Sequence, residues 1–466
     1  MTDVIVVGVG TCGEDAALRL MSAGLEVIGI EARLIGGECA YWACLPTKSM
    51  IRSANLLHEA RRADGLIGRV DVEPDWSLVS DRVRAEITGN WDDTPAVARF
   101  EGHGGRFVRG RGALTGPRTV VVDGAEFEAR RGIILATGSI PAIPPIPGLS
   151  DVEYWTTHQA VSTEELPRSL IVLGGGAVGC ELGQVLARFG VEVTIVEGAA
   201  RLLPGEEPEA SAVIIEAFTD EGITVLTRVR ATSARSGDGS IIVTLDDGSE
   251  LHGERLLVAT GRRVDLGGLG LEMAGVDGSG RFIAVDDYLR AADGIWAIGD
   301  VTGKGMLTQV ALYQSTIAVA DLLGHDPPPA DYTTLPRATF TDPEVGSVGL
   351  TEDQARGAGI DVDVVIKDLR STFRGWLHRS GNTGLIKLVA DRRAGMLVGA
   401  TVVGPHGAEV LGMLAVAVRT RAPLDDLVNM IYAFPTFYGG VGEALGAYGR
   451  GLTRVLDPGF TPMFDD

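Results

Sequence analysis

The 466-residue sequence has few cysteines, little positive charge and no long apolar run. Its four cysteines are too few for the disulfide framework of a secreted protein of this length. No apolar run approaches the roughly 18 residues that a membrane span needs. Lysine and arginine number 41 against 62 aspartates and glutamates, and the net charge of −21 argues against nucleic acids and anionic membranes as partners.

We expect no leader at the start of the chain, since residues 3–7 already have the pattern of a buried strand. We therefore expect a cytoplasmic protein. A metal site is not expected, because the seven histidines are scattered and no second Cys/His pair has ligand spacing. The length is that of roughly two to four domains.

One pattern occurs twice: an apolar strand, a Gly-x-Gly-x-x-Gly turn, a helical stretch, and a second strand that ends in a glutamate. The first copy consists of residues 4–7, then Gly8, Gly10 and Gly13, then residues 27–30 and Glu31. The second copy consists of residues 170–173, then Gly174, Gly176 and Gly179, then residues 193–196 and Glu197. The first glycine and the glutamate are 23 residues apart in both copies.

This pattern has a physical purpose in nucleotide binding. The first two glycines let the backbone turn and approach a pyrophosphate, and the third lets helix and strand pack closely. The N-terminus of the helix stabilises the phosphate charge, and the glutamate accepts hydrogen bonds from an adenosine ribose. Since every part recurs in order, the sequence predicts two Rossmann-type units rather than two glycine-rich turns.

Three further apolar runs end at small or acidic residues. Residues 133–136 lead to Thr137 and Gly138, residues 256–259 lead to Thr260 and Gly261, and residues 295–298 lead to Gly299 and Asp300. Ligands of open parallel sheets bind beyond the carboxyl ends of the strands, so we expect these residues near the nucleotides. For Asp300 taken alone, a helix cap is an equal alternative.

Cys39 and Cys44 stand five residues apart in the segment Gly-Gly-Glu-Cys-Ala-Tyr-Trp-Ala-Cys-Leu-Pro-Thr-Lys. In a regular helix, residues five apart lie about 140° apart around the axis, so their sulfurs could not bond. A bonded pair therefore requires distorted backbone at the start of a helix, which Pro46 permits. Lys48 and the helix N-terminus would favour a Cys44 thiolate. Two inert buried thiols are the alternative.

This segment resembles the GGxCxxxxCxPxK signature of the class I pyridine nucleotide-disulfide oxidoreductases, which are flavoprotein disulfide reductases. The resemblance covers essentially the whole chain in the family's order. It implies an α/β fold with two Rossmann-type domains, for FAD and NAD(P), and a C-terminal α+β interface domain that forms a homodimer. The implied domains are residues 1–149 and 280–330 for FAD, 150–279 for NAD(P) and 331–466 for dimerisation.

The resemblance also implies roles for individual residues. Cys44 corresponds to the thiol that faces the flavin, and Cys39 to the thiol that meets the substrate. Lys48 and Glu181 match an ion pair beside the flavin N5, although Glu181 could also be a solvated helix carboxylate. The residues expected to bind the two dinucleotides are Gly8, Gly10, Gly13, Glu31, Gly37, Ala113, Thr137, Gly138, Gly174, Gly176, Gly179, Glu197, Gly261, Asp300, Leu307 and Thr308.

The other two cysteines are Cys12 and Cys180, which lie within the glycine motifs. We expect them to be small packing residues rather than reactive thiols.

The C-terminal region departs from the family. The usual motif is His-Pro-Thr-x-x-Glu, whose His-Glu pair protonates the leaving thiolate across the dimer. Here Phe434 stands at the His position and Gly439 at the Glu position. Tyr432 or Tyr438 could donate a proton instead, but packing at a subunit interface is the favoured interpretation of both tyrosines. Residues 455–466 contain no cysteine, unlike the C-terminus of mercuric reductases.

The residue at the end of the second motif indicates which nicotinamide nucleotide donates the electrons. Glu197 favours NADH over NADPH, because a carboxylate pairs with a free 2′-hydroxyl and repels a 2′-phosphate. Neither Gly198 nor Pro204 supplies an arginine for such a phosphate, whereas Arg201 keeps NADPH open. We expect the electron acceptor to be a small molecule. The first hypothesis is a disulfide or related sulfur compound. The alternatives are a quinone reduced directly by the flavin, and a redox sensor with low turnover.

Overall fold

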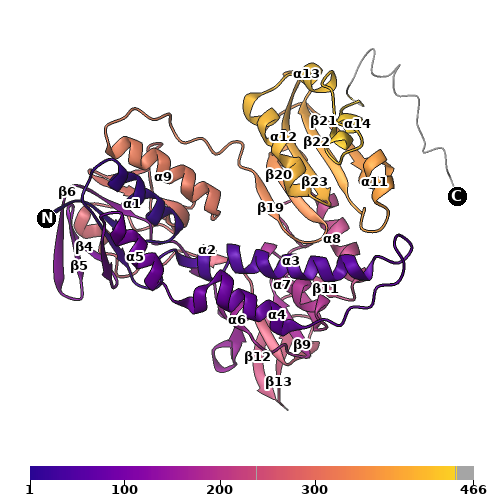
Figure 1. Ribbon diagram of the computed structural model, residues 1–466, viewed down its shortest axis with the longest axis horizontal. Coiled ribbons are helices and arrows are strands. Elements are labelled where there is room, and N and C mark those ends of the chain that lie inside the picture. The colour runs from indigo at the N-terminus through magenta and orange to yellow at the C-terminus, as the bar shows by residue number, and fades with distance from the viewer. Residues whose placement is uncertain (238, 447, 449–466) are drawn as a thin grey trace.

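The structure is a computed structural model, and it describes residues 1–237, 239–446 and 448. Figure 1 shows three bodies, each built on its own sheet: one at the N-terminus, one below the long helix α3 (Cys44–Arg61), and one formed by the yellow C-terminal elements. Residues 455–466, whose lack of cysteine was noted above, lie outside the described part.

The first body, here the FAD domain, is built on a mainly parallel sheet. Its strands are β1 (Thr2–Val7), β2 (Val27–Glu31), β3 (Arg106–Arg109), β4 (Ala113–Gly116), β5 (Thr119–Val122), β6 (Ala125–Leu135), β17 (Arg290–Ala292) and β18 (Ile295–Ala297). The order is β17-β18-β6-β1-β2-β3, and β18, β6, β1, β2 and β3 run parallel. Strand β1 is buried almost throughout, as expected where both faces of a parallel sheet are covered.

Three helices accompany this sheet: α1 (Thr11–Ser22), α5 (Thr94–Gly102) and α9 (Thr308–Leu322). Helices α1 and α9 pack against each other, and Figure 1 shows them side by side. The short 3-10 turn Gly299–Thr302 follows β18 and brings Asp300 to the carboxyl edge of the sheet, near the start of α9.

The second body, the NAD domain, has an all-parallel sheet in the order β11-β10-β9-β15-β8. Its strands are β8 (Tyr154–Trp155), β9 (Ser169–Leu173), β10 (Glu192–Glu197), β11 (Thr224–Thr227) and β15 (Arg255–Val258). The antiparallel strands β12 (Ala231–Gly237), β13 (Ser240–Leu245) and β14 (Glu250–Gly253) lie beside it, and α6 (Thr157–Ser162), α7 (Ala177–Arg188) and α8 (Pro208–Asp220) are its helices. The ribbon of β7 (Ile140–Pro141) and β16 (Arg262–Arg263) marks the passage to the FAD domain.

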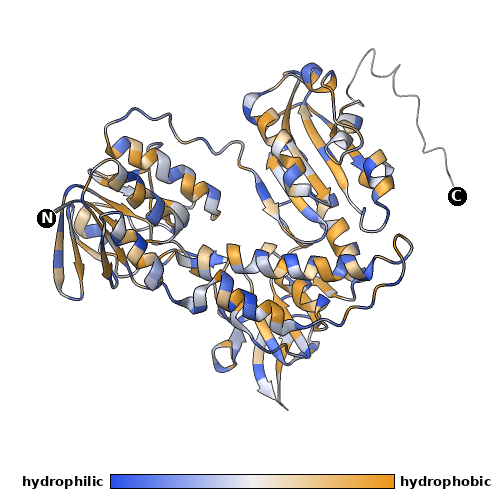
Figure 2. Cartoon of the chain, viewed as in Figure 1, coloured by the Kyte–Doolittle hydropathy of each residue, from blue (hydrophilic) through white to orange (hydrophobic). Residues whose placement is uncertain are grey.

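The third body, the interface domain, has an antiparallel sheet in the order β19-β20-β23-β22-β21. Its elements are β19 (Arg337–Thr339), β20 (Glu344–Gly349), α10 (Glu352–Gly357), β21 (Val362–Asp368), α11 (Phe373–His378), β22 (Leu385–Asp391), β23 (Met396–Gly404), α12 (Gly407–Thr420), α13 (Leu424–Val428) and α14 (Gly439–Leu445). Figure 2 shows that the central strands of this sheet are largely hydrophobic. Helix α12 covers one face of the sheet through Leu411 and Leu414.

Residues after the cysteine segment pack away from the FAD domain. Met50 and Ile51 of α3, Trp76 of α4 (Trp76–Asp81) and Val83 share one buried cluster with residues of β9, α7 and α8. The core that buries α3 and α4 is formed mainly by the NAD domain, with Val345, Leu385 and Val403 of the interface domain. The domain boundaries expected from the sequence stay a prediction. Among the described residues, no helix is both long and apolar enough to cross a bilayer.

Candidate active site

Cys39 and Cys44 form a disulfide, with their Cα atoms 4.6 Å apart. Cys39 lies in the short helix α2 (Gly37–Tyr41), and Cys44 is the first residue of α3. The two helices are separated at Trp42 and Ala43, and the backbone of Ala43 is not helical (φ −129°, ψ −96°). The expected distortion of the backbone between the two cysteines is therefore present, and it allows the sulfurs to meet.

Thr308 contacts both sulfurs. Its Oγ1 lies 3.3 Å from Cys44 Sγ and 3.4 Å from Cys39 Sγ. Thr308 is the first residue of the 15-residue helix α9, directly after Leu307, and Cys44 is the first residue of α3. Two helix N-termini thus meet at Cys44, and their partial positive charge stabilises a thiolate there.

Lys48 and Glu181 form an ion pair, with Lys48 Nζ 2.7 Å from Glu181 Oε2. The Glu181 side chain is 6% exposed and that of Lys48 is 38% exposed, so the carboxylate is not the solvated one considered as an alternative. Its other oxygen accepts a hydrogen bond from the Phe340 backbone N–H at 2.9 Å. Lys48 also lies 4.8 Å from the centre of the Phe340 ring. The role of this pair beside a flavin stays a prediction.

The two glycine motifs have the same geometry. Gly8 and Gly174 adopt φ of +92° and +107°, and a Cβ on either would lie 2.3 or 2.4 Å from a carbonyl oxygen of the neighbouring strand end. A Cβ on Gly13 or Gly179 would lie about as close to the carbonyl oxygen of the motif's own first glycine, at 1.9 and 2.0 Å. First and third glycines are therefore required by the turn and by helix packing, as the sequence predicts.

The glutamates at the strand ends also occupy matching positions. Glu31 accepts hydrogen bonds from the backbone N–H groups of Val9 at 2.8 Å and Arg33 at 2.7 Å. Glu197 accepts the equivalent bonds from Gly175 at 2.7 Å and Ala199 at 2.6 Å. Each carboxylate is thus held at the mouth of its glycine turn, where an adenosine ribose would lie.

The residues expected to bind FAD leave room and polar groups for it. The Cβ that Gly10 lacks would contact only the Gly37 Cα, at 3.8 Å, so the two bare glycines face each other and form a surface that backbone alone lines. The buried Thr137 hydroxyl has no hydrogen-bond partner among the described residues. The Asp300 carboxylate accepts a hydrogen bond from Ser139 Oγ. These features fit a dinucleotide passing from Glu31 towards the sulfurs.

Gly138 and Ala113, which are also expected to bind FAD, lie at the same sheet without a distinctive polar contact among the described residues. Gly138 has a positive φ of +67° directly after Thr137, and Ala113 begins β4 at the edge of the same sheet. Cys12 is buried beside Gly299, and burial raises the pKa of its thiol to about 12. Burial also raises the pKa of the Cys180 thiol. Both are free, inert thiols, in agreement with a packing role.

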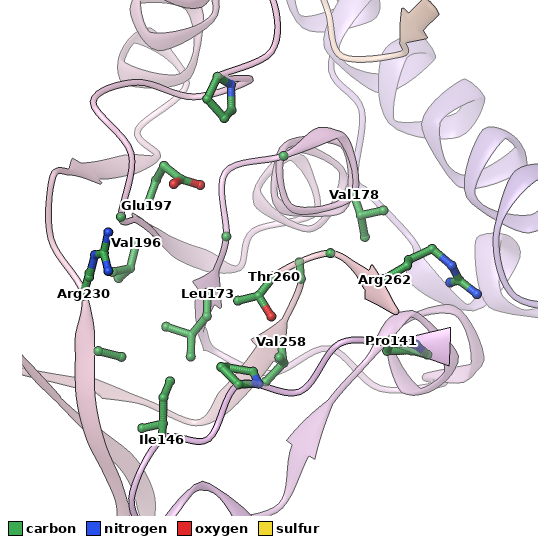
Figure 3. A pocket seen from close by; sticks show the side chains of 18 of the residues that line it. Pro141, Ile146, Leu173, Val178, Val196, Glu197, Arg230, Val258, Thr260 and Arg262 are labelled. Carbon is green, nitrogen blue, oxygen red and sulfur yellow. The ribbon is translucent and has the colours of Figure 1, made fainter. Parts of the chain in front are cut away.

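A cavity of about 600 Å³ lies at the carboxyl edge of the NAD sheet and is shown in Figure 3. Its walls include the expected residues Gly174, Gly176, Glu197 and Gly261. Gly179 lies behind the turn, against the Gly174 carbonyl. The cavity is lined mostly by apolar side chains and has a carboxylate at one end, as a site for an adenosine moiety requires.

A polar network that sequence reasoning missed joins this cavity to the cysteine segment. Arg262, which lines the cavity, donates to Ser139 Oγ at 2.7 Å, and its Nη2 lies 3.4 Å from Glu38 Oε2. His158 Nε2 lies 2.9 Å from the other Glu38 oxygen, and its ring stacks on Trp42. Burial alone would raise the pKa of Glu38, but the bond with His158 and the charge of Arg262 hold it below its usual value.

The position of Arg262 directly after the second Ala-Thr-Gly triplet was the only sequence signal for this network. Glu38 directly precedes Cys39, so the network touches the redox pair through its neighbour in the chain.

The structure places Phe434 and Gly439, the residues expected at the family's His and Glu positions, in the C-terminal segment. The Phe434 ring is 73% exposed and packs edge-on against Phe373, and Gly439 begins α14. Tyr432, the substitute donor considered above, donates its hydroxyl to the Leu427 carbonyl at 2.9 Å, and burial raises its pKa to about 12. Tyr438 accepts a hydrogen bond from the Ala433 N–H. Both tyrosines have the contacts of packing residues, and a donor role for Tyr432 stays a prediction.

Comparisons with known proteins agree with this geometry. Residues 2–315 match the family described as pyridine nucleotide-disulphide oxidoreductase, and residues 335–445 match its dimerisation domain. A dihydrolipoyl dehydrogenase of Thermus scotoductus is 34% identical over 98% of this chain and 99% of its own length. A mercuric reductase of Acidithiobacillus ferrooxidans is 33% identical over 97% of this chain and 83% of its own length.

Solved structures show the same likeness over the whole chain. The crystal structure of LpdA from Mycobacterium tuberculosis has a TM-score of 0.86 at 28% identity and covers 97% of this chain and 100% of its own. The HOCl-induced flavoprotein disulfide reductase RclA from Escherichia coli has a TM-score of 0.84 at 26% identity and covers 95% and 99%. This chain belongs to the pyridine nucleotide-disulphide oxidoreductase family and is an FAD-dependent NAD(P)H disulfide oxidoreductase with a redox-active Cys39–Cys44 pair.

Proposed function

We propose that this enzyme passes electrons from NADH to the Cys39–Cys44 disulfide and on to a disulfide or related sulfur compound, without a histidine acid. The observation that carries the proposal is the position of the pair: both sulfurs contact Thr308 at the point where α3 and α9 begin. The similar proteins named dihydrolipoyl dehydrogenase and flavoprotein disulfide reductase support a sulfur substrate.

The residues that would hold FAD are Glu31 at the adenosine ribose, Gly10 and Gly37 at the pyrophosphate, and Asp300 and Thr137 nearer the sulfurs. When bound, FAD supplies the hydride-accepting centre between the nicotinamide and the disulfide. The Glu197 carboxylate at the end of the cavity in the NAD domain favours the free ribose hydroxyls of NADH. We further propose a homodimer, because residues 335–445 match a dimerisation domain.

The sulfur chemistry can be written for the chain's own residues. In the reduced pair, the Cys39 thiolate attacks one sulfur of the substrate disulfide, forms a mixed disulfide and releases the other sulfur as a thiolate. The Cys44 thiolate then attacks Cys39 Sγ, which re-forms the Cys39–Cys44 bond and releases the second thiolate. Each released thiolate takes up one proton. Phe434 and Gly439 cannot supply it, so it comes from solvent.

The lack of an acid predicts a preference among disulfides. General acid catalysis contributes about 10²–10⁴-fold, and a disulfide whose leaving thiol has a low pKa needs it least. We therefore expect an aromatic disulfide with acidic thiols to be reduced much faster than lipoamide, at equal NADH. Phe434→His should raise lipoamide turnover more than aromatic disulfide turnover. Equal turnover of both disulfides by the wild type would contradict the proposed proton source.

A quinone acceptor is the second candidate. It is favoured by the exposed Phe434 ring, which offers an apolar contact where other members would carry a charged pair. Cys39→Ser distinguishes the two routes, because it should abolish the reduction of disulfides but leave the reduction of quinones by the flavin unchanged.

An anaerobic titration with NADH tests whether the cysteine pair takes part at all, since a thiolate beside the oxidised flavin gives a long-wavelength absorption band. If that band is missing in the wild type, the sulfur route is wrong.

A further inference from the structure

Arg230 stands apart from the other residues of the nucleotide cavity. It lies between β11 and β12, lines the cavity, and its side chain is exposed. Its backbone is held on both sides by Asp246, whose Oδ1 accepts from the Arg230 N–H at 3.1 Å and whose N–H donates to the Arg230 carbonyl at 2.9 Å. Among the described residues, the guanidinium itself has no hydrogen-bond or ion-pair partner. A fixed backbone thus carries an unpaired cation at the cavity wall.

The side chain of Arg230 covers the residue that follows the ribose-binding acid. A Cβ on Gly198 would lie 3.3 Å from both Cγ and Nε of Arg230, so this glycine leaves the space that the arginine occupies. Figure 3 shows Arg230 beside Glu197 and Val196 at the same end of the cavity. In a Rossmann unit, an arginine near this acid accommodates the 2′-phosphate of an NADP-type dinucleotide.

Arg201, the arginine that the sequence suggested for binding a 2′-phosphate, forms hydrogen bonds outside the cavity. Arg201 donates to the carbonyl oxygens of Pro204 at 3.1 Å and Glu206 at 3.3 Å, which holds its guanidinium against its own loop. Arg201 is not among the residues that line the cavity. Glu197 repels a phosphate less than a free carboxylate would, because each of its oxygens already accepts a backbone N–H bond.

We infer that Arg230 binds the 2′-phosphate of NADPH, so that this enzyme uses NADPH as well as NADH, and that Arg230 rather than Arg201 determines the ratio between them. The inference rests on the proposed use of this cavity for the nicotinamide dinucleotide. The planar guanidinium matches a phosphate with two parallel hydrogen bonds. Glu197 still accepts the ribose hydroxyls and keeps NADH the better substrate.

Binding of two adenosine fragments to the FAD-loaded protein tests the inference without turnover. Adenosine 2′,5′-bisphosphate carries the 2′-phosphate, and adenosine 5′-monophosphate lacks it. Measured by calorimetry, Arg230→Ala should weaken the bisphosphate about 10- to 100-fold, as loss of a charged hydrogen bond does, and the monophosphate by no more than about threefold. Arg230→Lys should keep part of the affinity for the bisphosphate.

The matched control is Arg228→Ala, since Arg228 is two residues away, exposed, and outside the cavity lining. It makes the same change in net charge and should leave both affinities within about threefold, because long-range charge is screened by salt. Equal weakening of both fragments by Arg230→Ala would show an adenine contact and overturn the inference, as would no weakening at all. The binding result does not depend on whether the enzyme reduces disulfides, because neither fragment carries a nicotinamide and no electron transfer is measured.

Discussion

The Glu181 carboxylate is buried and has a bonding partner for each of its oxygens. These partners are Lys48 Nζ and the Phe340 N–H. Residue identity and spacing were enough to predict both glutamates at the strand ends, whereas the Lys48–Glu181 pair was predicted from the family resemblance. The contacts within the Glu38–Arg262–His158 network and between Thr308 and the sulfurs could not be predicted, because these residues come from distant segments and no short pattern joins them.

Replacing Lys48 by methionine tests how much Glu181 depends on its partner. The variant leaves a buried carboxylate with one hydrogen bond, and we expect the free energy of unfolding to fall by about 1–3 kcal/mol. Urea denaturation of the FAD-loaded protein measures this. Arg52→Met, an exposed change on the same helix, is the control. A loss no larger than that of the control would show that Glu181 does not need the lysine.

At the scale of elements, the N-termini of α3 and α9 converge on Cys44. The alternating strand and helix pattern predicted both Rossmann sheets, because apolar runs and glycine turns are local features. The packing of α3 and α4 into the NAD domain was not predictable, since an amphipathic helix does not specify which of two neighbouring cores buries it. The antiparallel strands β12, β13 and β14 had no motif either.

Thr308→Val tests the contribution of the first residue of α9. Valine has the same shape but cannot donate to a thiolate, so the neutral thiol of reduced Cys44 is favoured. One hydrogen bond corresponds to about a two- to tenfold smaller thiolate population near neutrality. The rate at which iodoacetamide alkylates Cys44 of the two-electron-reduced protein, followed by mass spectrometry of the peptide that contains it, should fall by that factor. Thr308→Ser keeps the hydroxyl and should react like the wild type; if valine reacts as fast, Thr308 does not stabilise the thiolate.

At the scale of the whole molecule, a buried lysine joins two domains. Lys387 of β22 is 2% exposed, and its Nζ lies 2.9 Å from Glu207 and Glu209 and 3.0 Å from Glu352. Glu207 and Glu209 belong to the NAD domain, at the start of α8. Burial would lower the pKa of Lys387, but the three carboxylates outweigh it and raise the pKa above its usual value. The pKa of Glu352 is lowered, first by Arg356 and then by Lys387.

Lys387→Met should therefore destabilise the protein in a pH-dependent way. Near neutrality it leaves the buried Glu207 carboxylate without its cation, at a cost of about 3–5 kcal/mol. A carboxylate with a lowered pKa contributes stability above its unfolded pKa, and this contribution is lost as pH falls through the folded pKa. The difference in unfolding free energy between wild type and variant should narrow below about pH 4.5, as urea titrations from about pH 7 to about pH 3 would show. A constant difference would place the effect in packing alone.

The proposed dimer depends on apolar side chains that the single chain leaves exposed. On the interface domain these are Ile366, Trp376, Leu377, Val416, Met430, Ile431 and Phe434. Ile431 is 94% exposed, and Ile431→Glu should weaken self-association about tenfold or more, because a charge at an interface must be desolvated. Sedimentation velocity over a concentration series measures this, with Leu78→Glu on α4 as the control. A wild type that sediments as a monomer, or an unaffected variant, would contradict the proposal.

Helix α3 has a mechanical consequence for the enzyme. Its first residue carries one of the redox sulfurs, and its 18 residues, about 27 Å in length, lie against the body that binds the nicotinamide dinucleotide. Because Met50 and Ile51 of α3 are buried against the NAD domain, this helix connects that domain rigidly to the disulfide. We therefore expect a shift of the NAD domain to move Cys44 with it.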